Sequence, residues 1–291
     1  MPEEAKEPAP SPWETPKMSV GQFLDAVESL REYWRPRDDE ELWFRGERKH
    51  RDTRLCPQLY RQPEKRSLKP IPELLDIEFD LYEDFQRCGA QLCDTKPEDD
   101  WDWYFLMQHH GAPTRILDWS DGALNGLHFA LRNTELVPEE NAVVYVLQPY
   151  LLLDHIKALP DYVETQERWK TFLRDDPSES YANSEWDFAY LPNDEWKDKV
   201  PLPRAPLLWD TAHFTRRFGA QRSRFMLFGT DPLWMQNVAD THDWVKTIQI
   251  ESGSIPKIRR ELRDAGVTES VIFPDLDGLG REMRQVWDER R

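Results

Sequence analysis

The spacing of apolar residues along the chain predicts a mixture of helices and strands. Apolar side chains recur at the spacing of one helix face in the segments 19–30, 72–87, 101–109, 122–131 and 254–265. Short apolar or alternating runs predict strands at 41–46, within 108–120, and at 142–147, 225–229, 244–250 and 271–273. Ser19 is expected to cap the first helix, and Gly266 to end the last one.

The order of these elements favours an α+β fold. Helices and strands do not alternate as a doubly wound parallel sheet requires, and the glycine-rich motifs of dinucleotide-binding and P-loop proteins are absent. The motifs of α/β-hydrolases and zincin metalloproteases are absent as well. We expect a disordered tail rich in proline and glutamate at 1–17 and a single domain at 18–291, in which the acidic segment 154–200 forms an inserted cap.

Charge and cysteine content limit the classes of partner. The formal net charge of −17 disfavours binding to nucleic acid or to an anionic membrane, although arginine-rich islands at 45–54 and 216–224 leave a local basic cleft open. The alternative for these islands is a solvated face that balances nearby acids. Three irregularly spaced cysteines suit a reducing compartment, and the N-terminus has no apolar signal or membrane segment, so we expect a cytoplasmic, intracellular location.

The segment from Gln108 to Ser120 holds the densest group of polar and ionisable side chains. It contains Gln108, His109, His110, Thr114, Arg115, Asp118, Trp119 and Ser120 around a Gly-Ala-Pro turn. An apolar helix pattern follows at once, which predicts a turn, a strand and a helix entry. A strand that ends in polar groups at a helix start is suited to hold an anion or a nucleotide.

Several of these residues also have a purely structural interpretation. Thr114 and Arg115 suit a turn and a strand that bond neighbouring backbone, and Asp118 suits the N-cap of the next helix. Trp119 suits the core better than a stacking surface. His109 can bond a carbonyl at the end of its helix.

Candidate residues outside the segment 108–120 also have a structural interpretation. Arg45 can pair with one of the many acids, and Gln221 and Ser223 can lie at an exposed strand edge between arginines. Asp275 and Asp277, followed by Gly278, suit a tight loop. They make a poor metal site, because two carboxylates have no clear third ligand beside them. We therefore expect no metal.

Four motifs in order carry a family resemblance. They are Trp43-Phe44-Arg45-Gly46, Leu55-x-Pro57-x-Leu59-Tyr60-Arg61, the segment 108–120, and the run from Phe273 to Leu279. Together they resemble the FRG domain, which is named for its Phe-Arg-Gly triplet, over roughly residues 20–285.

FRG domains in turn resemble the ADP-ribosyltransferase superfamily, which implies a split β-sheet core with surrounding helices. Its toxin-like branch carries an Arg on a first strand, a Ser-Thr-Ser on a second and a Glu on a third, and the segments 44–46, 118–120 and 221–229 can be placed on that plan. The resemblance implies NAD as substrate. It also implies the cofactor-binding residues Arg45, Gly46, Gln108, Thr114, Arg115, Trp119 and Ser120.

The chemistry of NAD cleavage explains these residue types. Breaking the bond between nicotinamide and ribose passes through an oxocarbenium-like state, so the site must hold the diphosphate and stabilise positive charge on the ribose. Arg45 would hold phosphate or the adjacent ribose through its fork of donors, and Ser120 would order the ribose pocket. An acceptor on the third strand would bind a ribose hydroxyl and, if acidic, activate the nucleophile.

The third strand departs from the superfamily pattern. Alignment on Gly229 places Ser223 at the position of the catalytic Glu and Gln221 at the first residue of that pair, and neither is a base at neutral pH. Asp118 falls where a Ser is usual. The catalytic set implied is therefore His109, Asp118 and Gln221, with His110 as a further candidate for the base.

Two classes of function follow from this comparison. The first, slightly favoured, is an NAD-consuming enzyme, either a mono-ADP-ribosyltransferase or an NAD glycohydrolase. The second is a non-catalytic nucleotide-binding or protein-interaction module with the same fold. The partners expected are the small molecule NAD and, for a transferase, a protein acceptor, since the acidic body suits a basic protein or a small molecule better than nucleic acid.

Overall fold

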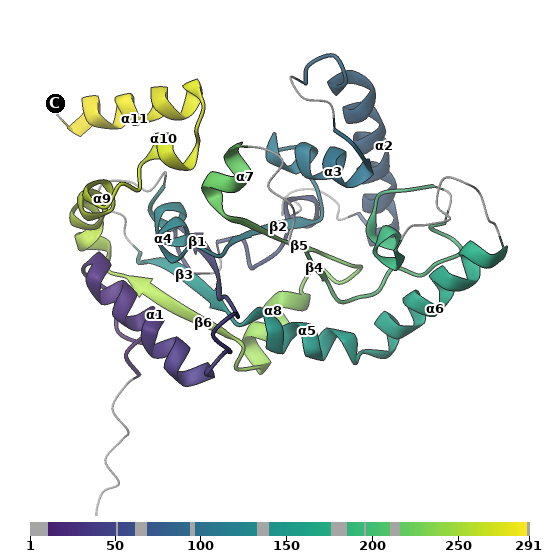
Figure 1. Ribbon diagram of the computed structural model, residues 1–291, viewed down its shortest axis with the longest axis horizontal. Coiled ribbons are helices and arrows are strands. Elements are labelled where there is room, and N and C mark those ends of the chain that lie inside the picture. Colours follow the sequence, from purple (N-terminus) through teal and green to yellow (C-terminus); the bar gives the residue numbers. More distant parts are fainter. Residues whose placement is uncertain are drawn as a thin grey trace, which may run out of the picture.

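A single antiparallel sheet runs through the part of the chain that the computed structural model describes, which is residues 11–50, 52–61, 69–93, 97–132, 140–175, 185–194, 196–209 and 216–289. The strand order is β4-β5-β2-β1-β3-β6, and each neighbouring pair is antiparallel (Figure 1). The strands are β1 (Trp43–Glu47), β2 (Ile116–Ser120), β3 (Ala142–Leu147), β4 (Leu207–Trp209), β5 (Ser223–Leu227) and β6 (Val245–Ile250). Together with the helices, this sheet confirms the predicted α+β class.

Helices surround the sheet and connect its strands. The α-helices are α1 (Val20–Trp34), α2 (Ile71–Gly89), α3 (Asp100–His109), α4 (Ala123–Leu131), α5 (Pro149–Lys157), α6 (Pro160–Asp175), α7 (Arg216–Gln221), α8 (Trp234–Thr241), α9 (Ile255–Asp264), α10 (Glu269–Ile272) and α11 (Leu276–Glu289). Short 3-10 helices are η1 (Gln58–Tyr60), η2 (Trp186–Tyr190) and η3 (Ser252–Ser254). The predicted caps are confirmed, because Ser19 Oγ accepts from the amide of Gln22 at 3.2 Å and Gly266 follows α9 with φ of 80°.

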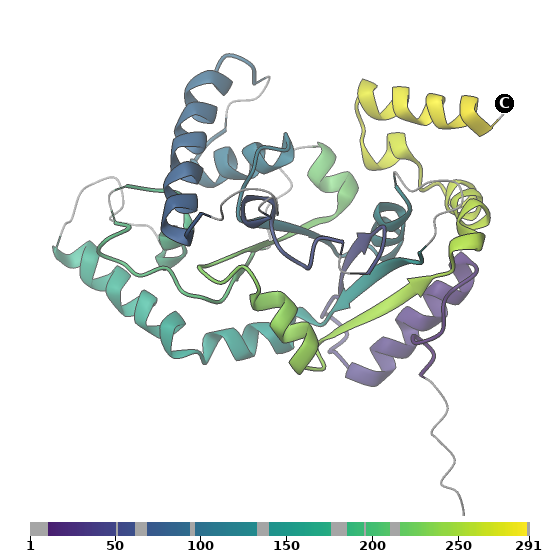
Figure 2. The same ribbon diagram turned by 180° about the vertical axis from the view of Figure 1, so that it is seen from behind.

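Alternation along the strands places apolar side chains on both faces of β1, β3 and β6. On one face, Phe44, Val144 and Ile248 pack against α1, α4 and α9. Figure 2 shows α1 and α9 beside β6 on this side of the molecule. On the other face, Tyr145 and Val245 pack against α5, α8 and η1. These three strands are therefore covered on both faces.

A separate aromatic cluster covers the other half of the sheet. Ile116 of β2 and Phe225 of β5 pack against α2, α3, α6 and η2, with the buried Trp169 at the centre of the helical layer. The segment 154–200, predicted as an inserted cap, contributes α6 and η2 to this cluster.

The two halves of the sheet meet at a narrow join between β1 and β2. A single residue pair, Phe44 and Ser120, links these strands, whereas β2 and β5 pair over five positions and β1 and β3 over another five. Strands in the middle of a sheet normally pair along their length. The sheet is thus nearly split between β1 and β2.

Close contact between β1 and α4 depends on two glycines. A Cβ on Gly46 would lie 2.1 Å from the carbonyl oxygen of Gly126 and 2.2 Å from the amide of Ala130, and a Cβ on Gly126 would lie 2.6 Å from Cβ of Phe44. No side chain fits at such distances. Gly46 is therefore required by packing, whatever else it does.

Two local predictions are wrong. The run 271–273, predicted as a strand, lies in and just after helix α10, because Ile272 and Phe273 are both buried while Val271 is exposed, which is not the alternation of a strand. Asp118 does not cap the following helix. The N-cap of α4 is Gly122, and Asp118 lies inside β2.

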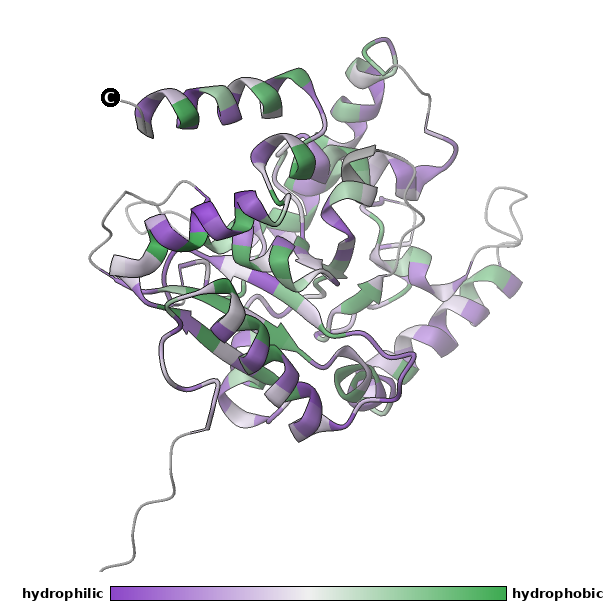
Figure 3. Cartoon of the chain, turned by 60° about the vertical axis from the view of Figure 1, so that its left-hand side comes forward, coloured by the Kyte–Doolittle hydropathy of each residue, from purple (hydrophilic) through white to green (hydrophobic). Residues whose placement is uncertain are grey.

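The ends of the chain differ in how they contact the sheet. Residues 1–10 of the predicted tail lie outside the described residues, but Lys17 is buried and its amide donates to the carbonyl of Gln249 in β6 at 2.8 Å. At the other end, α11 carries several exposed residues with large apolar side chains, and its ribbon shows green, hydrophobic bands between hydrophilic ones in Figure 3. These exposed residues are Leu276, Leu279, Met283 and Trp287.

Candidate functional site

A cavity of about 550 Å³ opens beside the narrow join between β1 and β2. Side chains from β1, β2, β5, α3 and α4 line it, together with Phe273. Seven of the predicted site residues lie on its wall: Arg45, Gly46, Gln108, His109, Asp118, Trp119 and Gln221. Residues far apart in the sequence are thus brought to one site.

Arg45 is held in place by three oxygen acceptors. Its Nε lies 3.2 Å from Glu47 Oε1, one terminal nitrogen donates to the carbonyl of Asp118 at 2.8 Å, and the other lies 3.4 Å from Thr53 Oγ1. Glu47 is buried and also accepts from the amide and hydroxyl of Thr53. Fixed guanidinium geometry of this kind is suited to bind an anionic group in a defined position.

Asp118 presents a carboxylate to the cavity. Its Oδ2 accepts from Nε2 of Gln108 at 2.8 Å, and the side chain is exposed. Gln108 is oriented in turn by the hydroxyl of the buried Thr114, which donates to Gln108 Oε1. Thr114 therefore does not line the cavity. It orients Gln108, and Gln108 in turn orients Asp118.

Two buried nitrogen donors in the cavity wall have no hydrogen-bond acceptor among the described residues. They are Nε1 of Trp119, a residue only 3% exposed, and Nε2 of Gln221. An unsatisfied buried N–H costs about 1–3 kcal/mol.

The hydroxyl of Ser120 is engaged within the protein. It donates to the carbonyl of Gln221 at 2.7 Å and accepts from the amide of Gly122 at 3.1 Å. Ser120 is buried and ties the end of β2 to the start of β5. It supports the wall of the cavity from behind.

Arg115 points to a different place. It is 2% exposed and forms a buried ion pair with Glu78 of α2, whose carboxylate also accepts from the amide of Arg115 and from the hydroxyl of Tyr104. Although burial lowers the pKa of Arg115, the charge of Glu78 raises it further, so the guanidinium stays protonated. The structure does not bring Arg115 to the cavity that holds Arg45.

Further cationic side chains lie on the cavity wall. Arg48, Arg61 and Arg132 join Arg45 there. Burial and the neighbouring charge of Arg45 lower the pKa of Arg61. Placing guanidinium groups so close together is unfavourable unless an anion or carboxylate lies between them. The cavity thus gathers four guanidinium groups in a protein of net charge −17.

Phe273 closes one side of the cavity. The guanidinium of Arg132 lies 4.0 Å from the centre of its ring, and Phe129 of α4 contacts the ring edge to face. Glu269 anchors this corner, since it pairs with Arg132 at 2.9 Å and with Arg281 of α11 at 2.6 Å. The motif at the C-terminal end of the chain is thereby joined to the cavity.

The strand β5 contributes no carboxylate to the cavity. Ser223 and Phe225 of β5 line it, whereas Gln221, predicted on this strand, lies at the end of α7, and Ser223 lies directly opposite Ser120 in the sheet register. His109 also lines the cavity, with its ring 5.0 Å from that of His110. Asp118, Glu47 and Asp52 are the carboxylates among the described lining residues.

Sequence reasoning missed several residues of this site. Glu47, Thr53 and Arg132 were not singled out, although Glu47 stands two residues after Arg45, a spacing that places both side chains on one face of a strand. Nothing in the sequence connects Thr53 or Arg132 to the cavity, because their contacts depend on how the loop and α4 pack against β1.

The described residues contain no group of three or more His, Cys, Asp or Glu side chains that could hold a metal ion. No helix in the described ranges is long and apolar enough to cross a membrane.

One family comparison gives a match. The family model of the FRG domain matches residues 40–137. This match confirms the predicted resemblance over that range, which includes β1, α3, β2 and α4. No curated protein and no solved structure matches the chain.

Proposed function

We propose that the cavity beside β1 and β2 binds NAD and that the protein cleaves the bond between nicotinamide and ribose. The observation that carries the proposal is that Gln221, at the end of α7 just before β5, lines one cavity with Asp118 of β2 and Arg45 of β1, and that β5, β2 and β1 are adjacent in the sheet. These are the three strands that correspond to the superfamily plan. The near split of the sheet between β1 and β2 supports an ADP-ribosyltransferase-like core.

The arginines suit the diphosphate of NAD. Arg45 is fixed by Glu47 and by the carbonyl of Asp118, and Arg61 lies close enough for its pKa to be affected. A diphosphate between them would offset their mutual repulsion and accept several charged hydrogen bonds.

Asp118 is the carboxylate best placed for the chemical step. Glu47 is occupied by Arg45 and Thr53, whereas the side chain of Asp118 is exposed on the cavity wall and accepts from Gln108. As the glycosidic bond breaks, nicotinamide leaves with the bonding electron pair, and the carboxylate stabilises the positive charge that develops on the ribose. Asp118 then takes a proton from the water or acceptor group that forms the new bond to the ribose carbon.

Trp119 and Gln221 supply donors for neutral parts of the ligand. Both residues line the cavity, and their indole and amide N–H groups have no acceptor among the described residues. Ribose hydroxyls and the nicotinamide carboxamide offer acceptor oxygens of the required kind.

A second candidate is a module that binds the nucleotide without cleaving it. It is favoured by Gln221 and Ser223, which occupy the positions where the resemblance implies a catalytic glutamate pair. The binding features of the cavity serve this function equally well.

The test is release of nicotinamide from NAD by the purified protein. Release that is lost in Arg45→Ala and retained in Arg37→Ala, an exposed surface arginine paired with Glu40, supports the enzyme. Micromolar NAD binding without release supports the binding module. Absence of both binding and release refutes the proposal. Labelled protein or nucleic acid in the reaction distinguishes transfer from hydrolysis.

A further inference from the structure

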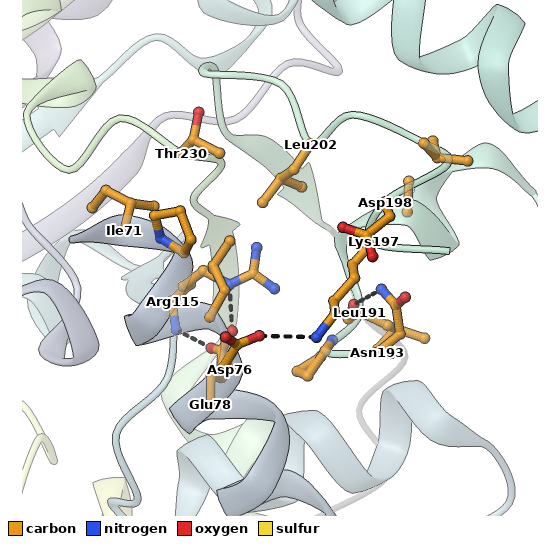
Figure 4. A pocket seen from close by; sticks show the side chains of 15 residues that line it. Ile71, Asp76, Glu78, Arg115, Leu191, Asn193, Lys197, Asp198, Leu202 and Thr230 are labelled. Atoms are coloured by element: carbon orange, nitrogen blue, oxygen red, sulfur yellow. Dashed lines mark hydrogen bonds and ion pairs between the residues drawn. The ribbon is translucent and has the colours of Figure 1, made fainter. Parts of the chain in front are cut away.

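A second cavity of about 570 Å³ lies between α2 and the segment that contains η2, and it shares no lining residue with the candidate site. Its size is typical of small-molecule sites. Eight of its fifteen lining residues are apolar, among them Ile71 and Leu75 from α2 and Leu191, Val200 and Leu202 from the segment after η2. Figure 4 shows these elements around an open centre.

The guanidinium of Arg115 lies in the middle of this cavity wall. Figure 4 shows it between Ile71 and Leu202, next to the carboxylate of Glu78. A guanidinium has five N–H groups. Nε donates to Glu78, the terminal nitrogens donate to the carbonyls of Tyr190 at 2.6 Å and Phe228 at 3.3 Å, and a further hydrogen bond involves the oxygen of Tyr60. Among the described residues, one N–H of this buried group is left without an acceptor.

The charge of Arg115 is already balanced. Glu78 is fully buried and receives three donors, so the pair presents no net charge to the cavity. At the entrance, Lys197 bridges from Asp194 at 2.6 Å to Asp76 at 3.0 Å, and Asp198 lies beside it. An anion entering here would meet more carboxylates than cations and would add an unbalanced buried charge.

We infer that this cavity is a second binding site, for a small uncharged molecule with an apolar body and one hydrogen-bond acceptor such as a ketone or amide carbonyl. The apolar walls receive the body and the open N–H of Arg115 donates to the acceptor. The inference does not depend on the proposed NAD chemistry, because the two cavities have separate walls.

The second cavity is connected to the candidate site through one strand. Arg115 directly precedes β2, which carries Asp118, and Thr114 on its other side orients the Gln108 that bonds Asp118. A molecule bound to Arg115 is therefore only a few backbone bonds from the carboxylate of the candidate site.

The test uses three fluorinated probes of similar size followed by fluorine NMR on the full chain. 4-Fluoroacetophenone has a carbonyl acceptor, 1-ethyl-4-fluorobenzene has none, and 4-fluorobenzoate is an anion. The expected order of affinity places the ketone first and the ethyl compound about fivefold or more weaker, the effect of one hydrogen bond in a buried site. The benzoate is expected to bind more weakly than the ketone.

Variants localise the binding. Leu202→Trp fills the cavity and is expected to abolish the ketone's line broadening, whereas Leu151→Trp, at an exposed position on α5, is expected to leave it unchanged. Leu75→Trp serves if Leu202→Trp does not fold. Equal binding of the ketone and ethyl compounds, preference for benzoate, no binding of the ketone, or unchanged binding in the filled variants would each overturn the inference.

Discussion

A terminal nitrogen of Arg45 lies 2.8 Å from the main-chain oxygen of Asp118 and donates a hydrogen bond to it across the join between β1 and β2. The same guanidinium contacts Glu47 in its own strand. The positions of the proposed anion-binding group and of the proposed catalytic carboxylate are therefore coupled, and the effects of substituting either one must be read with that coupling in view.

Asp118→Asn is expected to lower the rate of nicotinamide release by about 100-fold or more while leaving KM for NAD nearly unchanged, because the amide keeps the shape of the side chain but cannot accept a proton. Steady-state kinetics with NAD measure both values. Asp175→Asn, at an exposed position at the end of α6, is the control. Full activity of Asp118→Asn would show that Asp118 is not the general base, and His109 would be the next residue to test.

Gly46→Ala is expected to destabilise the fold by about 3 kcal/mol or more, since its Cβ would overlap the backbone of α4 and neither element can move freely. Thermal and denaturant unfolding measure the loss. The matched control is Gly280→Ala in α11, where a Cβ meets nothing within 4 Å, and a gain of up to about 1 kcal/mol is expected there. Equal stability of the two variants would contradict the observed packing.

Glu78→Gln tests whether the ion pair between Glu78 and Arg115 stabilises the fold. Removing one partner of a buried ion pair leaves the other charge uncompensated, and we expect a loss of about 3–5 kcal/mol in the free energy of unfolding. Glu73→Gln, on the exposed part of the same helix where Glu73 pairs with Lys69, is expected to cost below about 0.5 kcal/mol. A small effect at Glu78 would show that the pair contributes little to the folded state.

Glu269 predicts a specific dependence of stability on pH. Although burial raises the pKa of its carboxyl, the hydrogen bonds from His128, Arg281 and Arg132 lower it to about 2, from an ordinary value of 4.5. A lowered pKa means that the stabilisation is complete above the unfolded-state value and is lost as pH falls from about 4.5 towards 2.

Urea unfolding at several pH values measures this effect. The wild type is expected to lose roughly 3 kcal/mol more than Glu269→Gln across that range. Parallel pH profiles of the two proteins would contradict the assignment.

The sequence predicted most elements of the fold because their patterns are local. The β-branched run Ala142–Leu147 and the helical face of 254–265 each depend on neighbours a few residues away, and both are confirmed. The run 271–273 misled because three apolar residues fit either a strand or a short helix, and only the core that receives Ile272 and Phe273 decides between them.

Site residues were harder to assign because their roles depend on distant partners. Arg115 looks like a binding residue in its motif, yet its partner Glu78 stands 37 positions earlier on a different helix. Gly46 shows the converse case, since it lines the cavity and is also required by the approach of Gly126. Contacts between residues so far apart in the sequence cannot be predicted from composition or from the spacing of residues.

The single residue pair between β1 and β2 has a mechanical consequence. A sheet joined along its length resists shear through many hydrogen bonds, whereas this one resists at that seam through one backbone pair and the side chain of Arg45. We therefore expect the two halves to shift against each other more readily than fully paired strands do, and a ligand that touches both halves to hold them together. Stronger protection of the backbone amides of β1 and β2 from hydrogen exchange when a ligand is bound would measure this effect.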